Sequence, residues 1–549
     1  MKITKSTAWI LGIAVAVITL TAAKKSADHD KFFEISKNIE IFTNMYKELN
    51  TYYVDDLDPS RMMRTGIDAI MGSLDPYTNY ISESDMEGYR LIVEGKYNGI
   101  GASFDKIGEF VTVMDLYENS PAQKAGLKAG DRIAAVDGKN AQNRSVDEVG
   151  DILSGAPGTD VVLTVRRPGT TKDMKITITR DEITEENVPY EGMLRDGVGY
   201  VALTTFTRDA GGNVAKALKD MKAKNPDMKG LVLDLRGNGG GLLTEAVNLV
   251  NIFIPKGEVV VAIRGKVVEW DKAFKSLNEP VDEKIPVVIL IDKGSASASE
   301  IVSGALQDLD RAVLMGQRSY GKGLVQNTRD VGYNAKIKLT TAKYYIPSGR
   351  CIQAVRYEKG KPVELPDSLQ AKFTTKNGRT VLDGGGIKPD VYLETNANAG
   401  LLVDMQEQHI IFEYVNEYCI KHPKVDSTDK FKFTEFDDFT RFLAARKYEY
   451  ISKAEKSLQE ARTNAEKDKY SPELAAEIKT LETKLHASRA AELQKYQADI
   501  ISLIEQEVMS RFYYQRGRSQ IRLRNDTEIE RAIDLLLDPA KYNRLLKSK

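Results

Sequence analysis

Apolar and polar residues recur with different periods along the chain, and the changes of period divide it into sections. From Phe32 to about Leu91 the apolar positions follow at three- and four-residue steps, as on one face of an α-helix. Turn signals at Asp58-Pro59 and Asp75-Pro76 interrupt this pattern. The pattern predicts a small helical module within residues 25–95.

Between Tyr97 and about Ile183 the period shortens toward two, which is typical of half-buried β-strands. Glycine turns separate the apolar segments, and one helical pattern occurs near residues 146–153. Strands are expected at residues 110–113, 161–165 and 176–178. We therefore expect a β-rich domain over residues 96–183.

Strand and helix patterns alternate from Gly197 to about Val391. The apolar runs 231–235 and 287–291 are each followed by glycine and then by a helical pattern. Such alternation is typical of βαβ units, whose functional groups gather after the strand ends. The sequence predicts an α/β core, with helices on a partly parallel sheet, over residues 184–398.

Beyond residue 400 the chain becomes helical and highly charged. Ser471-Pro472-Glu473 is a strong helix start, and Leu474, Ile478, Leu481 and Leu485 follow at helical spacing. We expect the helices of residues 399–549 to be solvated and to pack on the rest of the chain or on a second subunit. A coiled-coil dimerisation arm is the alternative.

The N-terminus has the layout of a secretory signal. Lys2 and Lys5 precede an apolar stretch over residues 8–23, which ends in small residues before Lys24-Lys25. This stretch is short for a membrane-spanning helix, which needs about 20 residues. Residues 1–24 are expected to be a signal peptide or, alternatively, a retained anchor in the inner membrane. In both cases the protein is expected to be exported to the periplasm.

Composition narrows the classes of function. A chain of 549 residues is too long for one hydrophobic core. Lys and Arg (78) balance Asp and Glu (79), which argues against a nucleic-acid partner. Cys351 and Cys419 are the two cysteines, so a disulfide-rich scaffold and a four-cysteine zinc site are excluded, while one bridge or two free thiols stay open. No metal or other cofactor is expected.

The stretch GSASASE, residues 294–300, contains the first candidate chemistry. Ser297 and Glu300 fit a capping box, which alone is the simpler explanation. A serine between a buried strand and a helix is also held rigidly beside N–H groups that can stabilise an oxyanion. One of the three serines is therefore a candidate nucleophile.

A nucleophilic serine needs a base, and the α/β region contains no histidine. The chain has four: His29, His409, His422 and His486. A lysine can replace histidine, because a buried amine loses its proton more readily. Lys322, between Gly321 and Gly323, is the candidate. If residues 323–326 are extended, Gln326 lies on the same face as Lys322 and could orient the amine.

Residues 316–322 also spell GxxxxGK, the beginning of a phosphate-binding loop. Gly323 stands where a Ser or Thr must bind magnesium, and the following residues are strand-like rather than helical. We therefore expect no nucleotide site here.

The segments DKGSASASEIVSGALQDLDRA (292–312) and GQRSYGKGLVQ (316–326) closely resemble the signature of the C-terminal processing peptidases, or tail-specific proteases. These are Ser/Lys serine endopeptidases that carry a PDZ domain. In that family the middle serine of SASASE is the nucleophile, the base lies 25 residues later, and a glutamine four residues beyond orients it. The resemblance implies these roles for Ser297, Lys322 and Gln326.

The segment DLRGNGGGLL (234–243) resembles the family loop that supplies an oxyanion N–H. The resemblance implies Gly240 and Ala298 as donors, although Gly239 stands where many members have proline. Three further segments also resemble the family: LDPYTNYIS (74–82), TAKYYIPSGRCIQ (341–353) and GGGIKPDV (384–391). The resemblance covers about residues 32–395.

The segment SPAQKAGLKAGDRIAAVDGK (120–139) resembles the turn, helix and strand of a PDZ domain. The loop YNGIGASF (97–104) sits where PDZ domains place their carboxylate-binding loop, in which glycines let backbone N–H groups converge on a peptide C-terminus. The loop residues expected to bind it are Gly99, Ile100, Gly101 and Ala102. The implied fold is an α/β core of the ClpP/crotonase-like, ββα type with an inserted PDZ domain.

The resemblance implies an exported serine endopeptidase that recognises substrate C-termini and needs no cofactor. Protein or peptide substrates are the expected partners; a homodimer, an adaptor and membrane attachment stay open. The alternative is a non-catalytic PDZ-bearing chaperone or adaptor, and a crotonase-like acyl-CoA enzyme is weaker because no CoA-binding feature is found. The sequence does not determine whether the PDZ domain delivers substrates or blocks the site until it is bound.

Overall fold

The computed structural model describes residues 31–353, 355–358, 361–364, 368, 370–394, 399–468 and 472–547. The chain divides into two compact units, Met1–Pro76 and Tyr77–Lys549. The expected signal peptide or anchor, residues 1–24, lies outside the described residues. Within the described ranges, no helix combines the length and apolar character needed to span a membrane.

The first unit contains the predicted helices. One spans residues 31–52, and α2 spans Pro59–Gly72. Asp58 caps α2 by accepting a hydrogen bond from the N–H of Arg61, and Pro59 is the first helical residue, as its turn signal indicates. Phe33 and Ile39, which define the apolar period of the first helix, are exposed.

The β-rich section is a six-stranded antiparallel sheet with two helices, ordered β3-β4-β5-β7-β8 with β6 paired to β5. Its buried core runs from Ile100 to Ile178. A separate pair, β2 and β9, joins the beginning and the end of the section. The elements are β2 (Lys96–Gly99), β3 (Ala102–Ile107), β4 (Phe110–Leu116), α4 (Pro121–Lys124), β5 (Arg132–Val136), β6 (Lys139–Asn140), α5 (Val146–Leu153), β7 (Asp160–Arg166), β8 (Met174–Thr179) and β9 (Asp181–Thr184).

The α/β section is built on a six-stranded sheet of order β10-β11-β12-β15-β16-β23, parallel except for the edge pair β10–β11. The two apolar runs of the sequence are the central strands β12 and β15, and all their residues are buried. The strands are β10 (Tyr190–Met193), β11 (Val198–Ala202), β12 (Gly230–Asp234), β15 (Val287–Ile291), β16 (Val313–Gly316) and β23 (Val391–Tyr392).

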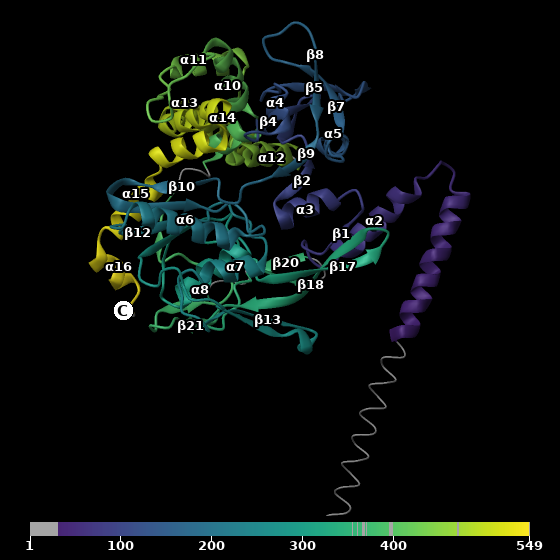
Figure 1. The fold of residues 1–549 in the computed structure, drawn as a ribbon. Helices are drawn as coiled ribbons and strands as arrows, with labels where there is room; N and C mark the ends of the chain where they lie inside the picture. The colour runs from purple at the N-terminus through teal and green to yellow at the C-terminus, as the bar shows by residue number, and fades with distance from the viewer. Residues whose placement is uncertain are drawn as a thin grey trace, which may run out of the picture. The chain divides into compact units, whose positions relative to one another are not determined.

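Helices cover both faces of this sheet. Leu231 and Leu233 of β12 pack with α6 (Ala210–Lys224), α7 (Leu243–Val250) and α8 (Ala298–Asp308). Val232, which points the other way, packs in a second cluster with the C-terminal helices. Those helices are α15 (Thr527–Leu536) and α16 (Pro539–Leu545), and Figure 1 shows α15 beside β12. The charged extension therefore completes the core, a role that its composition does not indicate.

A second sheet has the order β1-β18-β13-β14, with β17 also paired to β18. Its strand β1 lies in the region predicted to be helical; that prediction was wrong here because residues 79–81 pair with residues 336–338 of β18. The elements are β1 (Asn79–Ile81), α3 (Met86–Glu94), β13 (Val259–Gly265), β14 (Lys272–Lys275), β17 (Leu324–Gly332) and β18 (Ala335–Tyr345). Two hairpins follow: β19 (Val355–Glu358) with β20 (Lys361–Glu364), and β21 (Lys372–Thr374) with β22 (Thr380–Leu382).

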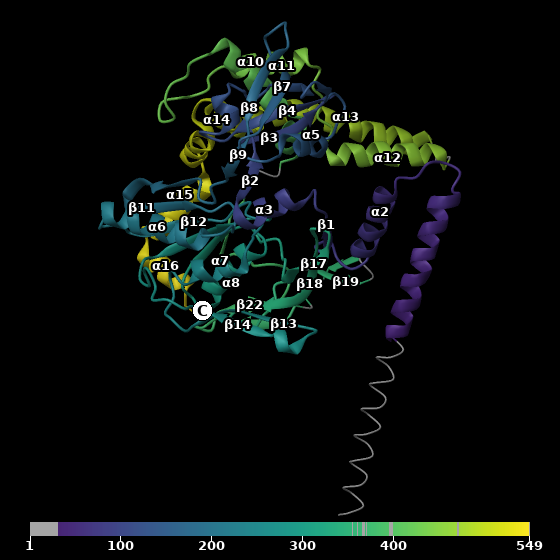
Figure 2. The same cartoon turned by 45° about the vertical axis from the view of Figure 1, so that its right-hand side comes forward.

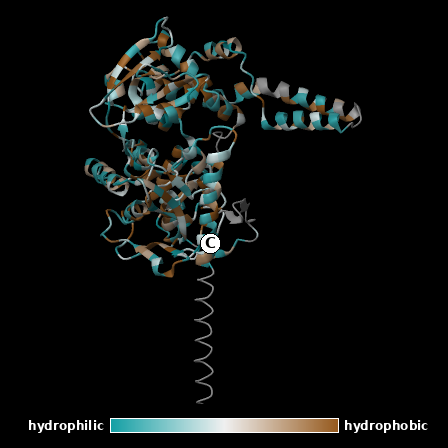
Figure 3. Cartoon of the chain, turned by 90° about the vertical axis from the view of Figure 1, so that its right-hand side faces the viewer, coloured by the Kyte–Doolittle hydropathy of each residue, from teal (hydrophilic) through white to brown (hydrophobic). Residues whose placement is uncertain are grey.

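The chain beyond residue 399 is helical, as predicted, and has its own aromatic-rich core. Within it α12 and α13 run alongside each other and are joined by the ion pair Arg462–Glu482 (Figure 2). Figure 3 shows that this helix pair is largely hydrophilic, in agreement with the expected solvated helices. The helices are α9 (Gly400–Glu407), α10 (Ile410–Lys421), α11 (Phe436–Ala445), α12 (Lys453–Lys467), α13 (Pro472–Lys495) and α14 (Gln497–Arg524).

Candidate active site

Ser297 lies immediately before α8, in the connection from β15. Its backbone has φ 54° and ψ −113°, a region that residues with a side chain rarely adopt. The next N–H, that of Ala298, belongs to the first residue of α8 and so has no acceptor within the helix. This strained turn places the serine beside a donor group, an arrangement that favours attack on a carbonyl.

The contacts of the other serines distinguish them from Ser297. Ser295 and Ser299 are completely buried. The hydroxyl of Ser295 donates to the carbonyl oxygen of Leu235, and that of Ser299 donates to the carbonyl oxygen of Asn238, both at 2.8 Å. These two serines therefore bind α8 and the connection before it to the segment after β12, whereas Ser297 is partly exposed.

The carboxylate of Glu300 holds the main chains of Ser297 and Lys322 together. One of its oxygens, Oε2, accepts from the N–H of Ser297 and from the N–H of Lys322, each at 2.8 Å. The other oxygen accepts from the N–H of Gly321 at 2.7 Å and from the hydroxyl of Ser319 at 2.5 Å. Glu300 thus braces the start of α8, as the capping box predicts, and also fixes the backbone of the expected base.

Tyr344 forms a second bridge between the same two residues. Its buried hydroxyl donates to the carbonyl oxygen of Lys322 at 2.6 Å and lies 3.2 Å from that of Ser297. The amine of Lys322 lies 4.5 Å from the centre of the Tyr77 ring. Tyr77 therefore lies directly beside the expected base.

The ionisation of Glu300 provides a testable pH dependence. Burial raises the pKa of Glu300 to about 7, and its four donors only partly offset this effect. The raised pKa stabilises the folded state below about pH 4.5, and this stabilisation is lost as the pH rises through 7. The four hydrogen bonds to Glu300 depend on pH in the opposite direction, because only the ionised carboxylate can accept all four. They are therefore complete only above about pH 7. We expect kcat to rise through about pH 7.

The variant Glu300→Gln should lose this rise of kcat with pH, because an amide does not titrate. Its kcat should also fall about 100-fold, because Ser297 and Lys322 would be misplaced. Glu148→Gln is the matched control, because Glu148 forms the same capping box at the start of α5. A pH–rate profile that is the same for Glu300→Gln and wild type would contradict this role of Glu300.

Gly240 lies directly against the candidate nucleophile. A Cβ atom at Gly240 would be 2.7 Å from the Cβ of Ser297 and 2.9 Å from the nitrogen of Ala298, and φ here is +103°. Both observations require glycine. The N–H of Gly240 donates to Oδ1 of the buried Asn238 at 2.9 Å. Gly240 and Ala298 are therefore neighbours, as two oxyanion donors must be, but in this conformation Asn238 accepts from Gly240.

Gln326 lies on β17, as its extended pattern predicts. Its amide donates to the hydroxyl of Thr340 at 3.2 Å. The pairing of β17 with β18 shifts register between Val325 and Gln326, which interrupts the alternation that would align Gln326 with Lys322. The orienting role of Gln326 stays a prediction.

The phenol of Tyr97 lies beside the expected carboxylate loop of the β-rich domain. Burial raises the pKa of Tyr97 to about 12, and hydrogen bonding from the backbone of Gly101 and Ala102 partly offsets this. The carbonyl oxygens of Ile100 and Gly101 accept from Ala122 and Tyr117, which holds the loop in place. Main-chain hydrogen bonds therefore hold the loop in place, with the phenol of Tyr97 beside it.

The structure also bears on the rejected alternatives. The residues after Lys322 form β17, so the GxxxxGK segment lacks the helix of a phosphate-binding loop. His409 lies 3.4 Å from Asp105, and His422 lies 3.3 Å from Glu435. The carboxylates that these two histidines contact do not belong to the candidate site. In the part of the chain that is described, no group of three or more His, Cys, Asp or Glu residues could hold a metal ion, and both cysteines are free thiols.

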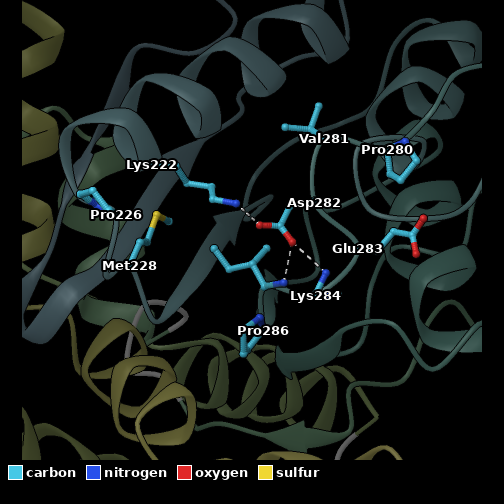
Figure 4. A pocket seen from close by; sticks show the side chains of 10 residues that line it. Lys222, Pro226, Met228, Pro280, Val281, Asp282, Glu283, Lys284 and Pro286 are labelled. Atoms are coloured by element: carbon cyan, nitrogen blue, oxygen red, sulfur yellow. Dashed lines mark hydrogen bonds and ion pairs between the residues drawn. The ribbon is translucent and has the colours of Figure 1, made fainter.

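Sequence reasoning missed two residues of the site. Tyr344 and Tyr77 lie in the segments 341–353 and 74–82, which resemble the peptidase family, but a tyrosine alone gives no indication of a contact with the site. A pocket of about 600 Å³ lies elsewhere: Figure 4 shows it lined by residues such as Lys222, Met228 and Asp282, none of which belongs to the predicted site.

Comparison with known proteins gives three matching family models. "Peptidase family S41" matches residues 197–360, "PDZ domain" matches 112–167, and "Probable PDZ-protease, C-terminal helical domain" matches 401–536. The expected α/β peptidase core with a PDZ domain is thereby confirmed, with a helical domain after it.

Curated relatives agree with these models. The carboxy-terminal-processing protease of Bartonella bacilliformis is 37% identical over 333 residues, which are 60% of this chain and 76% of the relative. A probable CtpA-like serine protease of Staphylococcus aureus (strain COL) is 34% identical over 357 residues, 64% of this chain and 70% of the relative. Among solved structures, the photosystem II D1 C-terminal processing protease is 25% identical, with 64% of this chain and 92% of that chain covered and a TM-score of 0.35. By its identity to these curated relatives and its S41 core, the chain belongs to peptidase family S41 and is a serine peptidase of the carboxy-terminal-processing type.

Proposed function

We propose that this peptidase hydrolyses peptide bonds with a dyad of Ser297 and Lys322 and selects substrates by their C-terminal ends through the PDZ domain. The main support is the shared clamp: one buried carboxylate, Glu300, binds the main-chain N–H groups of both dyad residues. The main chains at Ser297 and Lys322 thus share one acceptor, which supports their assignment as a pair.

In the proposed reaction, neutral Lys322 takes the proton of Ser297 as its Oγ attacks the scissile carbonyl carbon. The N–H groups of Ala298 and Gly240 stabilise the oxyanion, each by about 3 kcal/mol on the usual mutational scale. The N–H of Gly240 can contribute once it donates its hydrogen bond to the oxyanion instead of to Asn238. The amine of Lys322 then returns the proton to the leaving amine, and water hydrolyses the acyl-enzyme by the same steps.

The loop of residues 99–102 supports selection of tails. Its N–H groups at Gly101 and Ala102 lie near the phenol of Tyr97. A C-terminal carboxylate that replaces the Tyr97 phenol would be a stronger acceptor for them, because hydrogen bonds to a charged oxygen are about twice as strong. Tyr97 has to move aside for this to happen.

A pair of otherwise identical unstructured peptides, one with a free C-terminal carboxylate and one amidated, tests the proposal with wild-type enzyme. We expect both to be cleaved in the presence of a chelator, with a KM about tenfold lower for the free acid. Equal KM values would contradict tail selection. If neither peptide is cleaved, the peptidase activity itself fails and the non-catalytic adaptor gains support.

Export to the periplasm is also part of the proposal. It rests on Lys2, Lys5 and the apolar stretch over residues 8–23. The intact mass of the protein isolated from its own cells distinguishes a cleaved signal from a retained anchor, and recovery of the full-length chain in the cytosol would contradict export.

A further inference from the structure

Arg236 lies in the loop that carries Gly240, and its charge is almost completely buried. Only 6% of its side chain is exposed. Its Nε and Nη2 atoms donate to the two oxygens of Asp234, at 2.9 Å and 2.6 Å, at the end of β12. Burial opposes the charged form, but the neighbouring carboxylates outweigh burial and raise the pKa of Arg236 well above its ordinary value. Its position therefore depends on these ion pairs.

The remaining partners of Arg236 come from the C-terminal extension. Nη2 lies 2.8 Å from a carboxylate oxygen of Asp526, and Nη1 donates to Glu528 at 2.6 Å. Both acidic side chains are only 10% exposed. They stand at the start of α15, where Asp526 also caps the helix by accepting from the N–H groups of Glu528 and Ile529. The helix start is thus fastened to the loop.

The same loop reaches the candidate nucleophile within a few residues. Asn238, two residues after Arg236, accepts through its carbonyl oxygen from the N–H of Ala296 at 3.0 Å and from the hydroxyl of Ser299 at 2.8 Å. Its side chain accepts from the N–H of Gly240 at 2.9 Å. A displacement of Arg236 would therefore be transmitted to Gly240 and, on either side of Ser297, to Ala296 and Ser299.

We propose that Arg236 is a positioning residue that couples the C-terminal helix α15 to the oxyanion loop, so that Asp526 and Glu528 are required for turnover and not only for folding. The inference rests on the proposed function of Gly240 and Ser297. It gives Asp526 and Glu528 a role in catalysis although they touch no substrate.

The buried charges explain why the coupling should be strong. One guanidinium is shared by Asp234, Asp526 and Glu528, and removing a single partner from a buried ion pair leaves the others imperfectly compensated. The loop would then relax toward a different arrangement. Loss of one oxyanion donor reduces kcat by about 10²–10³-fold, so partial displacement of Gly240 should cost less than complete loss.

The test compares Glu528→Gln with Glu530→Gln in the full-length enzyme. Glu530 lies on the same helix but binds the exposed Arg195 at the surface. For Glu528→Gln we expect kcat for a peptide to fall at least tenfold with KM within a factor of two, and the rate of fluorophosphonate labelling to fall in parallel. Glu530→Gln should match wild type. The fraction of folded enzyme is measured by circular dichroism at the assay temperature.

A second variant keeps the helix start intact. Asn caps helices as well as Asp does, so Asp526→Asn should preserve α15 while it removes one charge from Arg236. A tenfold loss of kcat in this folded variant supports the coupling. Normal kcat per folded molecule in both Glu528→Gln and Asp526→Asn, whatever their melting temperatures, would overturn it and leave a purely structural ion pair. Wild type is measured in the same assay. If wild type cleaves the peptide, the result with the variants bears only on the coupling and not on the proposed function.

Discussion

Replacement of Ser297 by alanine should abolish peptide cleavage, with kcat lower by on the order of 10⁴-fold or more, because no other group can form the acyl-enzyme. The substitution removes one hydroxyl from a partly exposed position, so the melting temperature should change little. Activity is measured with the free-acid peptide, and the amount of folded protein is measured by circular dichroism.

Ser303→Ala is the matched control for this experiment. Ser303 lies on the same helix, is buried, and donates back to the carbonyl oxygen of Ser299. Its loss should cost a little stability and leave turnover intact. If Ser297→Ala retained a tenth or more of wild-type kcat, Ser297 would not be the nucleophile.

Replacement of Lys322 by alanine should reduce kcat by about 10³–10⁴-fold, close to the effect of removing the serine, since residues that act as one catalytic unit are not additive. Lys322→Arg should be equally inactive, because a guanidinium stays protonated at any accessible pH and cannot act as a base. The double variant Ser297→Ala/Lys322→Ala should be no slower than Ser297→Ala alone.

Lys216→Ala controls for the general effect of removing a lysine, because Lys216 forms a surface ion pair with Asp220 on α6. It should behave as wild type. Substantial turnover by Lys322→Arg would mean that the positive charge, rather than proton transfer, is what Lys322 contributes.

The strands that form the centre of the fold could be predicted because apolar patterning alone specifies them. The runs 231–235 and 287–291 are buried on both faces, and apart from Asp234 at the end of β12 they are wholly apolar. β1 could not be predicted in the same way. It is three residues long, and its pairing with β18 depends on residues more than 250 positions away.

The residue types of the candidate site could be predicted from the sequence. The hydrogen bonds and ion pairs that hold these residues in place could not. The spacing of Ser297, Lys322 and Gly240 resembles a known family, and the structure brings Ser297 close to Gly240 and to the backbone of Lys322. The double clamp by Glu300 was not predictable, because a capping glutamate and a glutamate that also binds a distant loop have the same sequence signature. The contacts of Arg236 with Asp526 and Glu528 likewise join segments almost 300 residues apart.

The proposed dyad is tested most directly by mapping the site of fluorophosphonate attachment by tandem mass spectrometry of the labelled full-length enzyme. The peptide that contains GSASASE presents three serines in five residues, so the fragment ions decide between them. We predict a single adduct on Ser297, formed by wild type and absent from Lys322→Ala. An adduct on Ser295 or Ser299, or labelling of Ser297 that proceeds equally fast without Lys322, would contradict the proposed dyad.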